Sequence, residues 1–291
     1  MIKRPFFTIA KPKLRGSRVW GLPKEVLMEI PLPKKAIFLV REPFPKVEDL
    51  TVGIGDRVRT GQKIRLTKNR EGYFISSVTG TVSSISPRSG AMGQAFTAVS
   101  VNVADEDQPD EEFGRVAKER NLESVIQYLG SLPGAPDFGS LLRIHPPLDT
   151  LVVKGVDSDL LVTKDQFVVD TEAEALKQGI ATLKSLTGIQ KVIFLVPDYL
   201  KAEAEKTGAE VRGMALLYPD TLPKMILKNL FGKTVPVGKR VEDLGVGFVS
   251  AEAVVALHNA FSEARIPLRK LMTVIRKDGS AVQAKARLGT P

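Results

Sequence analysis

The sequence predicts an α/β protein in which a β-rich N-terminal domain precedes a parallel, helix-flanked sheet. Short apolar runs broken by glycine and proline fill residues 1 to 103, and prolines at that density exclude long helices. From residue 121 onward, short buried runs alternate with amphipathic stretches, which is the pattern of strand–helix–strand units.

The segment Val58–Ile85 and the residues before it predict short strand pairs joined by tight turns. Gly55, Gly61 and Gly80 stand where the chain is expected to reverse, because glycine accepts a positive φ without a steric cost. A Gly-Asp-x-Val-x-x-Gly-Gln unit followed by Ser-x-x-x-Gly-Thr-Val is similar to barrel-sandwich hybrid domains of the biotinyl and lipoyl shape. A carrier of that shape needs a lysine at the hairpin tip, where this chain has Asn69–Gly72, so a swinging-arm carrier is not expected.

The middle of the chain predicts a Rossmann-like α/β domain. A buried strand at Thr150–Val153, a helix at Thr171–Leu186 ended by Gly188 and a strand at Lys191–Val196 form one βαβ unit. We expect Asp170 or Thr171 to cap that helix. The same reasoning predicts helices at 121–129, 199–207, 223–232 and 251–264, and strands at 210–217 and 245–249.

The last residues resemble the opening of a β-grasp domain, with strands joined by Lys277-Asp278-Gly279. The predicted organisation is a basic arm plus barrel-sandwich hybrid domain at 1–103, an acidic linker at 104–120, the Rossmann-like domain at 121–266 and an apparently incomplete β-grasp domain at 267–291.

Composition narrows the function. No apolar run approaches the ~18 residues that span a bilayer, and residues 1–13 contain no apolar signal region, so we expect a cytoplasmic protein. The 291 residues include no cysteine, which excludes disulfides, thiolate nucleophiles and cysteine-ligated metals or clusters. The two histidines, His145 and His258, predict a loop residue and a helix residue, and we expect no metal site.

The net charge of +9 is unevenly distributed. The first 24 residues contain no acid and seven bases, namely Lys3, Arg4, Lys11, Lys13, Arg15, Arg18 and Lys24. Such an arm is compatible with a solvated or partner-docking segment, with an anionic membrane surface or with nucleic acid. Nucleic acid is not expected, because the few aromatic residues match no RNA-binding pattern. The stretch Asp105–Glu112 is acidic and predicts a surface linker.

The order of these parts resembles the RnfC family, the peripheral subunit of the Rnf ion-translocating electron-transport complex. The related NqrA subunit is more distant, and the flavoprotein subunit of respiratory complex I shares the Rossmann-like and β-grasp (SLBB-like) domains. The segments that carry the resemblance are Ile30–Lys35, the glycine unit at 55–62, Asp149–Gly155, Leu161–Asp165, Leu217–Pro219 with Lys224, Val235–Gly238 and Arg265–Leu268 with Val274.

The resemblance implies an oxidoreductase subunit, peripheral to the inner membrane, that transfers electrons from NADH to FMN. It also implies that the partners are other subunits of a membrane electron-transport complex, with the basic arm near the anionic membrane. An iron–sulfur cluster is not expected in this chain, because it has no cysteine.

The family has a glycine-rich loop before the βαβ unit, where bare backbone amides approach a phosphate. This chain has Gly130–Gly139 there, with Pro133 and Pro136 removing two donors and Asp137 adding a negative charge. Two interpretations stay open, a nucleotide site around Gly134 or a structural turn.

The family's Asn-Gly-x-Glu-x-Glu-Pro motif corresponds to Lys154–Leu160 here. The resemblance therefore assigns cofactor binding to Gly155, Asp157, Asp159 and Lys224, with no catalytic residue identified. Two functions follow: NADH-to-flavin electron entry at a degenerate form of the family's cofactor site, or a non-catalytic docking subunit that has lost that site.

Overall fold

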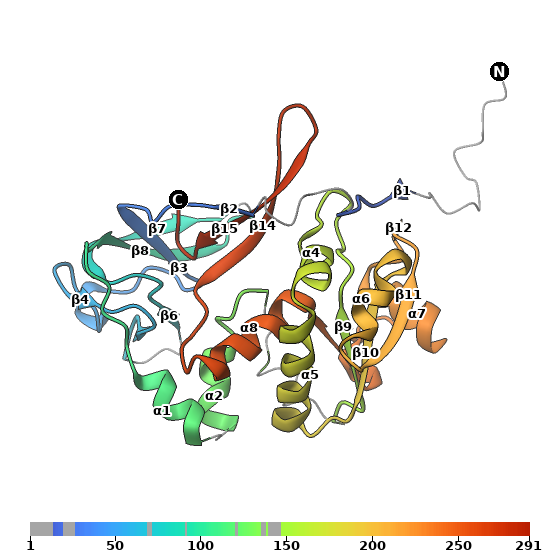
Figure 1. Cartoon of the computed structure of the whole chain (residues 1–291). Helices are drawn as coiled ribbons and strands as arrows, with labels where there is room; N and C mark the ends of the chain where they lie inside the picture. The colour runs from blue at the N-terminus through green and yellow to red at the C-terminus, as the bar shows by residue number, and fades with distance from the viewer. Residues whose placement is uncertain are drawn as a thin grey trace.

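The computed structural model describes residues 14–19, 27–68, 72–90, 92–119, 122–134, 138 and 147–291. A β-rich part lies on the left of Figure 1 and a helix-flanked sheet on the right, with a long hairpin projecting between them. The fold is thus a mixed α/β protein with several separate sheets, as the sequence predicts.

The β-rich part is a half-barrel of two antiparallel sheets, in the orders β3-β8-β7-β4 and β5-β6. Phe38 and Phe74 stack in its core with ring centroids 4.9 Å apart. The strands are β3 (Lys35–Val40), β4 (Arg57–Val58), β5 (Lys63–Arg65), β6 (Tyr73–Ile75), β7 (Gly80–Ser89) and β8 (Ala95–Val103), and a 3-10 turn, η1 (Val47–Asp49), follows β3.

The glycines of this part differ in their roles. Gly55 and Gly61 have φ angles of 97° and 86°, which confirms the predicted turns. Gly80 instead opens β7, so the prediction of a reversal there is wrong. An added Cβ at Gly80 would lie 2.1 Å from the carbonyl oxygen of Asn102 on the paired strand, and close approach of the two strands therefore requires glycine.

A parallel four-stranded sheet forms the second part, in the order β11-β10-β9-β13. Its strands are β9 (Thr150–Lys154), β10 (Lys191–Pro197), β11 (Glu210–Met214) and β13 (Val246–Ser250). The structure confirms the predicted strands to within a few residues. Along β9, Leu151 and Val153 belong to one apolar core and Val152 to another, as expected of a strand buried on both faces.

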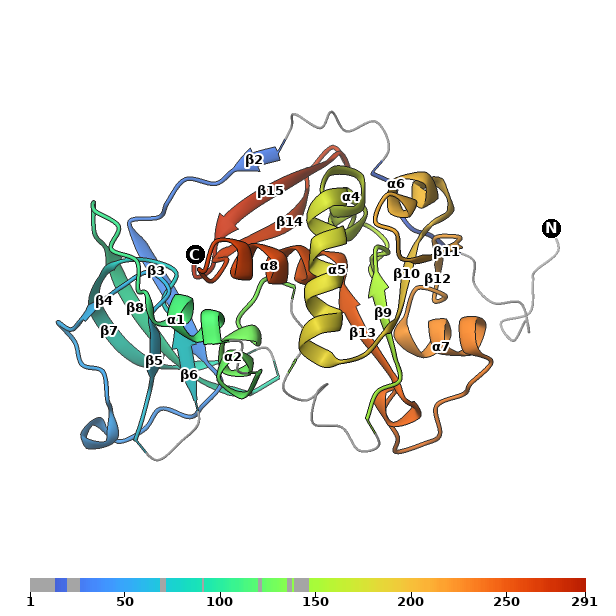
Figure 2. The same ribbon diagram turned by 60° about the horizontal axis from the view of Figure 1, so that its bottom comes forward.

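Helices cover both faces of this sheet (Figure 2). The pair α5 (Ala173–Thr187) and α8 (Ala251–Ser262) packs on the face of Leu151, while α7 (Pro223–Phe231) packs Ile226 and Leu227 on the face of Val152. Glycines in the left-handed region end α5 and α7, as predicted. The predicted cap of α5 is wrong, because a separate helix, α4 (Lys164–Thr171), precedes it and Glu172 is the N-cap.

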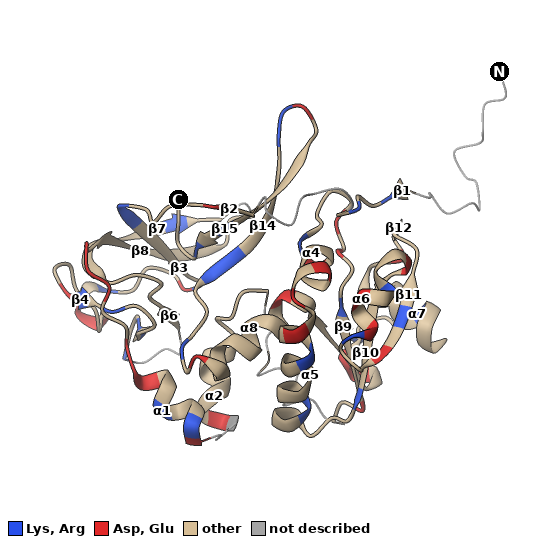
Figure 3. Ribbon diagram, viewed as in Figure 1, with Lys and Arg blue, Asp and Glu red and all other residues tan. Residues whose placement is uncertain are grey.

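Four short elements complete this part. They are α6 (Lys201–Glu205), β12 (Leu217–Tyr218) and the 3-10 turns η2 (Asp198–Leu200) and η3 (Glu242–Leu244). The acidic residues that follow β8 lead into α1 (Glu112–Glu119) and α2 (Leu122–Leu129), as Figure 3 shows in red.

The projecting hairpin belongs to a third sheet. It consists of β14 (Arg269–Ile275) and β15 (Ala281–Arg287), and β2 (Leu27–Glu29) adds to β15 in parallel. Far upstream, β1 (Leu14–Arg15) pairs with β12 at the edge of the second part. The N-terminal segment thus contributes strands to two sheets before it enters the β-rich part.

Candidate functional site

The strand order places the candidate site between β9 and β13. From β9, the chain adds β10 and β11 on one side and then returns to add β13 on the other, so the direction of strand addition reverses at β9. Ligands of open parallel sheets bind outside the carboxyl ends of the strands at such a switch point. Lys154 ends β9 and pairs in register with Ser250, which ends β13.

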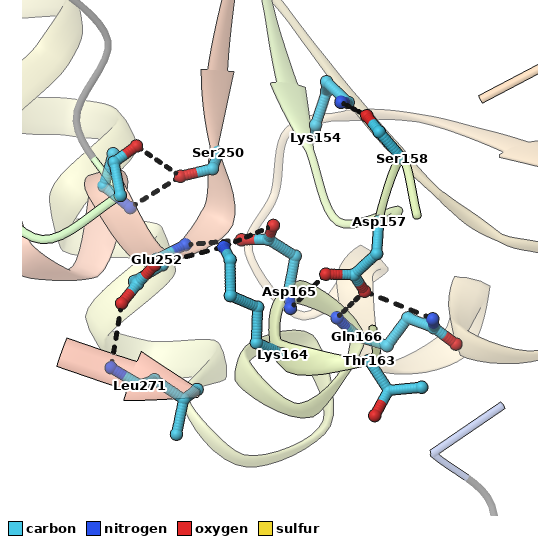
Figure 4. Close-up of polar contacts among 12 residues, drawn as sticks. Lys154, Asp157, Ser158, Thr163, Lys164, Asp165, Gln166, Ser250, Glu252 and Leu271 are labelled. Carbon is cyan, nitrogen blue, oxygen red and sulfur yellow. Dashed lines mark hydrogen bonds and ion pairs between the residues drawn. The ribbon is translucent and has the colours of Figure 1, made fainter. Parts of the chain in front are cut away.

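The N-terminus of α4 points into this region and is capped by Asp157 (Figure 4). The Asp157 carboxylate accepts hydrogen bonds from the backbone N–H groups of Asp165 (3.1 Å) and Gln166 (3.4 Å) and from Nε2 of Gln166 (3.2 Å). The first backbone N–H groups of a helix have no partner within the helix, and an anion is stabilised there. Asp157 is only 6% exposed, so its carboxyl group is a buried cap of the α4 N-terminus.

Asp165 likewise accepts a backbone N–H from the first turn of α8. Its Oδ1 accepts a hydrogen bond from the backbone N–H of Glu252 (3.1 Å), in the first turn of α8. Ser250 is the N-cap of that helix and its Oγ accepts a hydrogen bond from the N–H of Ala253 (3.1 Å). The N-termini of α4 and α8 therefore meet at the switch point, and side chains of the protein accept hydrogen bonds from backbone N–H groups of both helices.

Glu252 completes the cluster. It accepts a hydrogen bond from the backbone N–H of Leu271 in β14 (3.0 Å), and Lys270 Nζ lies 3.2 Å from its Oε2. Lys164 bridges Glu252 (3.1 Å) and Asp165 (2.8 Å). Three buried carboxylates, Asp157, Asp165 and Glu252, thus each accept a backbone N–H from a different element; we call them the carboxylate cluster.

Burial and charge shift the protonation of these groups. Burial and then the Asp165 carboxylate raise the pKa of Asp157, against the lowering effect of its hydrogen bonds. Burial lowers the pKa of Lys164, but Asp165 and Glu252 outweigh it and the net pKa lies above the usual range of lysine. Burial lowers the pKa of Lys154, whose Nζ donates to Ser158 Oγ (2.7 Å). Lys164 therefore stays charged and holds two of the three carboxylates together.

The structure brings Gly134 to this cluster but fills the space above it. Gly134 has φ +67°, and a Cβ built on it would lie 2.6 Å from Glu252 Oε2 and 2.8 Å from Ser250 Oγ. Its carbonyl oxygen accepts a hydrogen bond from Ser250 Oγ (2.9 Å). Of the other residues singled out in this loop, Pro133 is buried in the same turn, whereas Pro136 and Asp137 lie outside the described residues.

The remaining predicted positions are dispersed. Gly155 is required for packing, since a Cβ there would lie 2.5 Å from Cγ2 of Val169 in α4. Asp159 is exposed and shares with Asp157 a cavity of about 10 Å³, too small for any ligand. Lys224 is exposed on the first turn of α7 and does not line that cavity. The sequence thus identified Gly134 and Asp157 near the switch point but missed Lys164, Asp165 and Glu252 as the groups that fill it.

The described residues do not fit a flavin phosphate at this place. A phosphate needs unpartnered N–H groups, and those at the starts of α4 and α8 already bond to Asp157, Asp165 and Ser250. Gly134, where a phosphate could approach the backbone, faces the Glu252 carboxylate, and that negative charge would repel a phosphate.

Two further expectations concern metal ions and membrane spans. Among the described residues, no group of three or more His, Asp or Glu side chains is arranged to hold a metal ion. His258 lies half-buried on α8, whereas His145 is outside the described residues. No helix in the described ranges is long and apolar enough to cross a membrane.

Comparison with known proteins confirms the predicted resemblance. Residues 23–107 match the RnfC barrel sandwich hybrid domain. Over 288 aligned residues, covering 91% of the chain, it is 24% identical to the RnfC-type subunits of the ion-translocating oxidoreductase complexes of Salmonella typhimurium and Salmonella arizonae. The chain spans 39% and 42% of the length of these two relatives.

Solved structures give a weaker likeness. An NAD+-reducing [NiFe]-hydrogenase in the H2-reduced state aligns with a TM-score of 0.48 at 16% identity, over 62% of this chain and 39% of the other. The air-oxidized state gives a TM-score of 0.46 at 16% identity, over the same shares of the two chains. Both values are too low to establish a shared fold.

Proposed function

We propose that this chain is a docking subunit of an ion-translocating oxidoreductase complex and holds no flavin of its own. The observation that carries the proposal is the carboxylate cluster, in which the protein's own acids take the backbone N–H groups that a cofactor phosphate would need. The complex is inferred from the relatives, which are subunits of such complexes.

Electron entry would require chemistry that the described residues do not supply. Asp157 and Glu252 are 6% and 5% exposed and already accept hydrogen bonds from backbone N–H groups of α4 and β14, so their burial keeps both carboxylates from a ribose hydroxyl or a flavin edge. With no cysteine, the chain cannot ligate an iron–sulfur cluster through thiolates. A docking role is compatible with both facts.

Docking has a candidate surface in the basic arm, residues 1–24. Its seven bases without an acid would be attracted to acidic faces of the other subunits and to the anionic membrane surface beside them. Salt screens such attraction at distances beyond the Debye length, which is about 8 Å at physiological ionic strength. We therefore expect peripheral, salt-sensitive association with the complex at the inner membrane.

Affinity purification of the tagged full chain from its own cells, in mild detergent, tests the proposal. The integral subunits of the complex should co-purify at low salt and be lost at about 0.5 M salt. Replacing Lys3, Arg4 and Lys11 with alanine should weaken the association. Replacing three exposed helix lysines, Lys118, Lys177 and Lys228, changes the net charge equally and should leave it intact.

Two outcomes would oppose the proposal. Recovery of the chain without any membrane subunit, under every salt condition, would exclude a docking role. Co-purification of stoichiometric flavin with the isolated chain would instead restore the electron-entry function.

A further inference from the structure

Residues 14–19, which we call the strap, lie across the carboxyl edge of the parallel sheet on the side of β10 and β11 (Figure 1). β1 pairs antiparallel with β12, with Leu14 opposite Tyr218 and Arg15 opposite Leu217. The backbone N–H of Gly16 donates to the carbonyl oxygen of Leu216 (2.9 Å). The strap thus extends β12 as an added strand, in the manner of peptides that bind sheet edges.

Beyond β1, the strap contacts two further elements. The N–H of Ser17 donates to the carbonyl oxygen of Leu160 (2.7 Å), and the Ser17 carbonyl accepts a hydrogen bond from Nε2 of Gln166 in α4 (3.2 Å). The N–H of Val19 donates to the Tyr199 hydroxyl (3.2 Å), which in turn donates to Gln166 Oε1 (2.5 Å). Gln166 and Tyr199 are therefore linked to each other and to the strap.

Side chains of the strap also have defined positions. Val19 is 5% exposed and belongs to the main apolar core. The Arg18 guanidinium lies 5.4 Å from the centroid of the Tyr199 ring, within the range of a cation–π contact. Arg15 and Arg18 line an open cavity of about 430 Å³ together with Asp198, Tyr199, Met214 and Leu217. These features resemble a bound peptide more than a surface tail.

We propose that this edge is a binding site for an extended peptide, which the chain's own residues 14–19 occupy. The ligand is an extended strand with the pattern of residues 15–19: a base, two small residues, a second base and an apolar residue. The site recognises it through Leu160 and Leu216 carbonyls, Gln166 and Tyr199. It adjoins the carboxylate cluster, because Nε2 of Gln166 donates both to the Ser17 carbonyl oxygen and to Asp157 (3.2 Å each). The proposal stands whether or not the arm docks to a complex.

Cutting the chain after the strap tests whether the site holds a peptide. A protease recognition sequence inserted after Gly21 in the full chain lets residues 1–21 be severed from the folded protein. The severed fragment should remain bound during gel filtration at about 10 µM protein. A fluorescein-labelled peptide of residues 11–20 should exchange into the cut protein. It should bind the uncut protein at least about 100-fold more weakly, because the tethered strap competes at an effective concentration near millimolar.

A matched pair of peptides tests the contacts. Gly16→Pro removes the N–H that bonds to Leu216 and should weaken binding at least about fivefold, the effect of one neutral hydrogen bond. Gly16→Ala keeps that N–H, and its Cβ would meet no atom closer than 3.6 Å, so binding should change less than about twofold. In the protein, Tyr199→Phe removes the hydroxyl that accepts the Val19 N–H and donates to Gln166, and it should weaken the wild-type peptide at least about fivefold, the effect of one neutral hydrogen bond.

The outcomes are separable. Loss of the fragment on cutting, with no saturable binding of the peptide to the cut and correctly folded protein, would overturn the proposal. Equal binding of the proline and alanine peptides would also overturn it, since adhesion would then not use the strand pairing. Tight binding that survives both Gly16→Pro and Tyr199→Phe would point to a charge-driven contact of the basic residues instead and would likewise refute the site.

Discussion

Substitution of Glu252 gives the sharpest stability test of the carboxylate cluster. Its carboxylate is 6% exposed and accepts hydrogen bonds from the backbone N–H of Leu271 and from Lys270, while Lys164 lies 3.1 Å away. Glu252→Ala removes all three contacts and leaves the buried Leu271 N–H without an acceptor. Glu252→Gln keeps the shape and an acceptor oxygen, and removes only the charge.

The expected magnitudes follow from those contacts. A buried donor left without a partner costs ~1–3 kcal/mol, and a hydrogen bond to a charged group contributes ~1.5–3 kcal/mol. Lys164 keeps Asp165 as a partner and Lys270 can reach solvent, which limits the loss. We therefore expect Glu252→Ala to lower the free energy of unfolding by ~3–4 kcal/mol and Glu252→Gln by ~1–2 kcal/mol. At ~2 °C per kcal/mol for a protein of this size, the alanine variant should lose ~6–8 °C in Tm.

Urea unfolding followed by circular dichroism, with a thermal scan alongside, measures both variants. The exposed Glu205 on α6 provides the control, because Glu205→Ala should change the free energy of unfolding by less than ~0.5 kcal/mol. If Glu252→Ala were as stable as the control, Glu252 would not carry the contacts described and the cluster would be a surface feature.

Three further predictions concern neighbouring residues. Because the pKa of Asp157 is raised to about 7, the folded protein binds this proton more tightly than the unfolded chain does. The free energy of unfolding should therefore fall as the pH rises from about 4 to about 7, and urea unfolding of Asp157→Asn should lack that decline. Lys164→Met leaves the Asp165 and Glu252 carboxylates facing each other without their cation, so it should cost ~3 kcal/mol in urea unfolding at neutral pH; a loss no larger than that of Glu205→Ala would contradict this. Gly134→Ala should cost ~2 kcal/mol more than Gly188→Ala, because both glycines have positive φ but only the first faces crowding atoms; equal losses would show that the space above it is free.

Elements with local signals were predictable from sequence. The strand β10 is a continuous apolar run, and α5 and α7 end at glycines that adopt the left-handed conformation. The parallel arrangement followed from the alternation of such elements. In each of these segments, the local residues determine whether a helix or a strand forms and where it ends.

The helix α4 lacked such a signal, so its contacts with Asp157 were not predicted from the sequence. Five of its eight residues are buried, including Asp165 and Gln166, so no apolar stripe marks it as an amphipathic helix. The family resemblance assigned the Asp157 carboxylate to a cofactor, and the sequence offered no helix N-terminus as another partner for it. Once α4 is present, its N-terminal N–H groups account for that carboxylate.

The strands β1 and β2 were missed for a different reason. β1 has two residues and pairs with β12, and β2 has three residues and pairs with β15, so both partners lie more than 200 residues away in the sequence. A local pattern contains no information about such partners. The use of the basic arm as a strand was therefore beyond sequence reasoning, although its charge was evident.

Equilibrium dialysis of the purified, flavin-free full chain against FMN tests the central claim most directly. Because the chain's own carboxylates already bond to the N–H groups at the starts of α4 and α8, we predict no saturable binding up to about 1 mM FMN, which corresponds to less than ~4 kcal/mol of binding free energy. Saturable binding with a Kd in the micromolar range would contradict the account, since a phosphate would then have displaced those carboxylates.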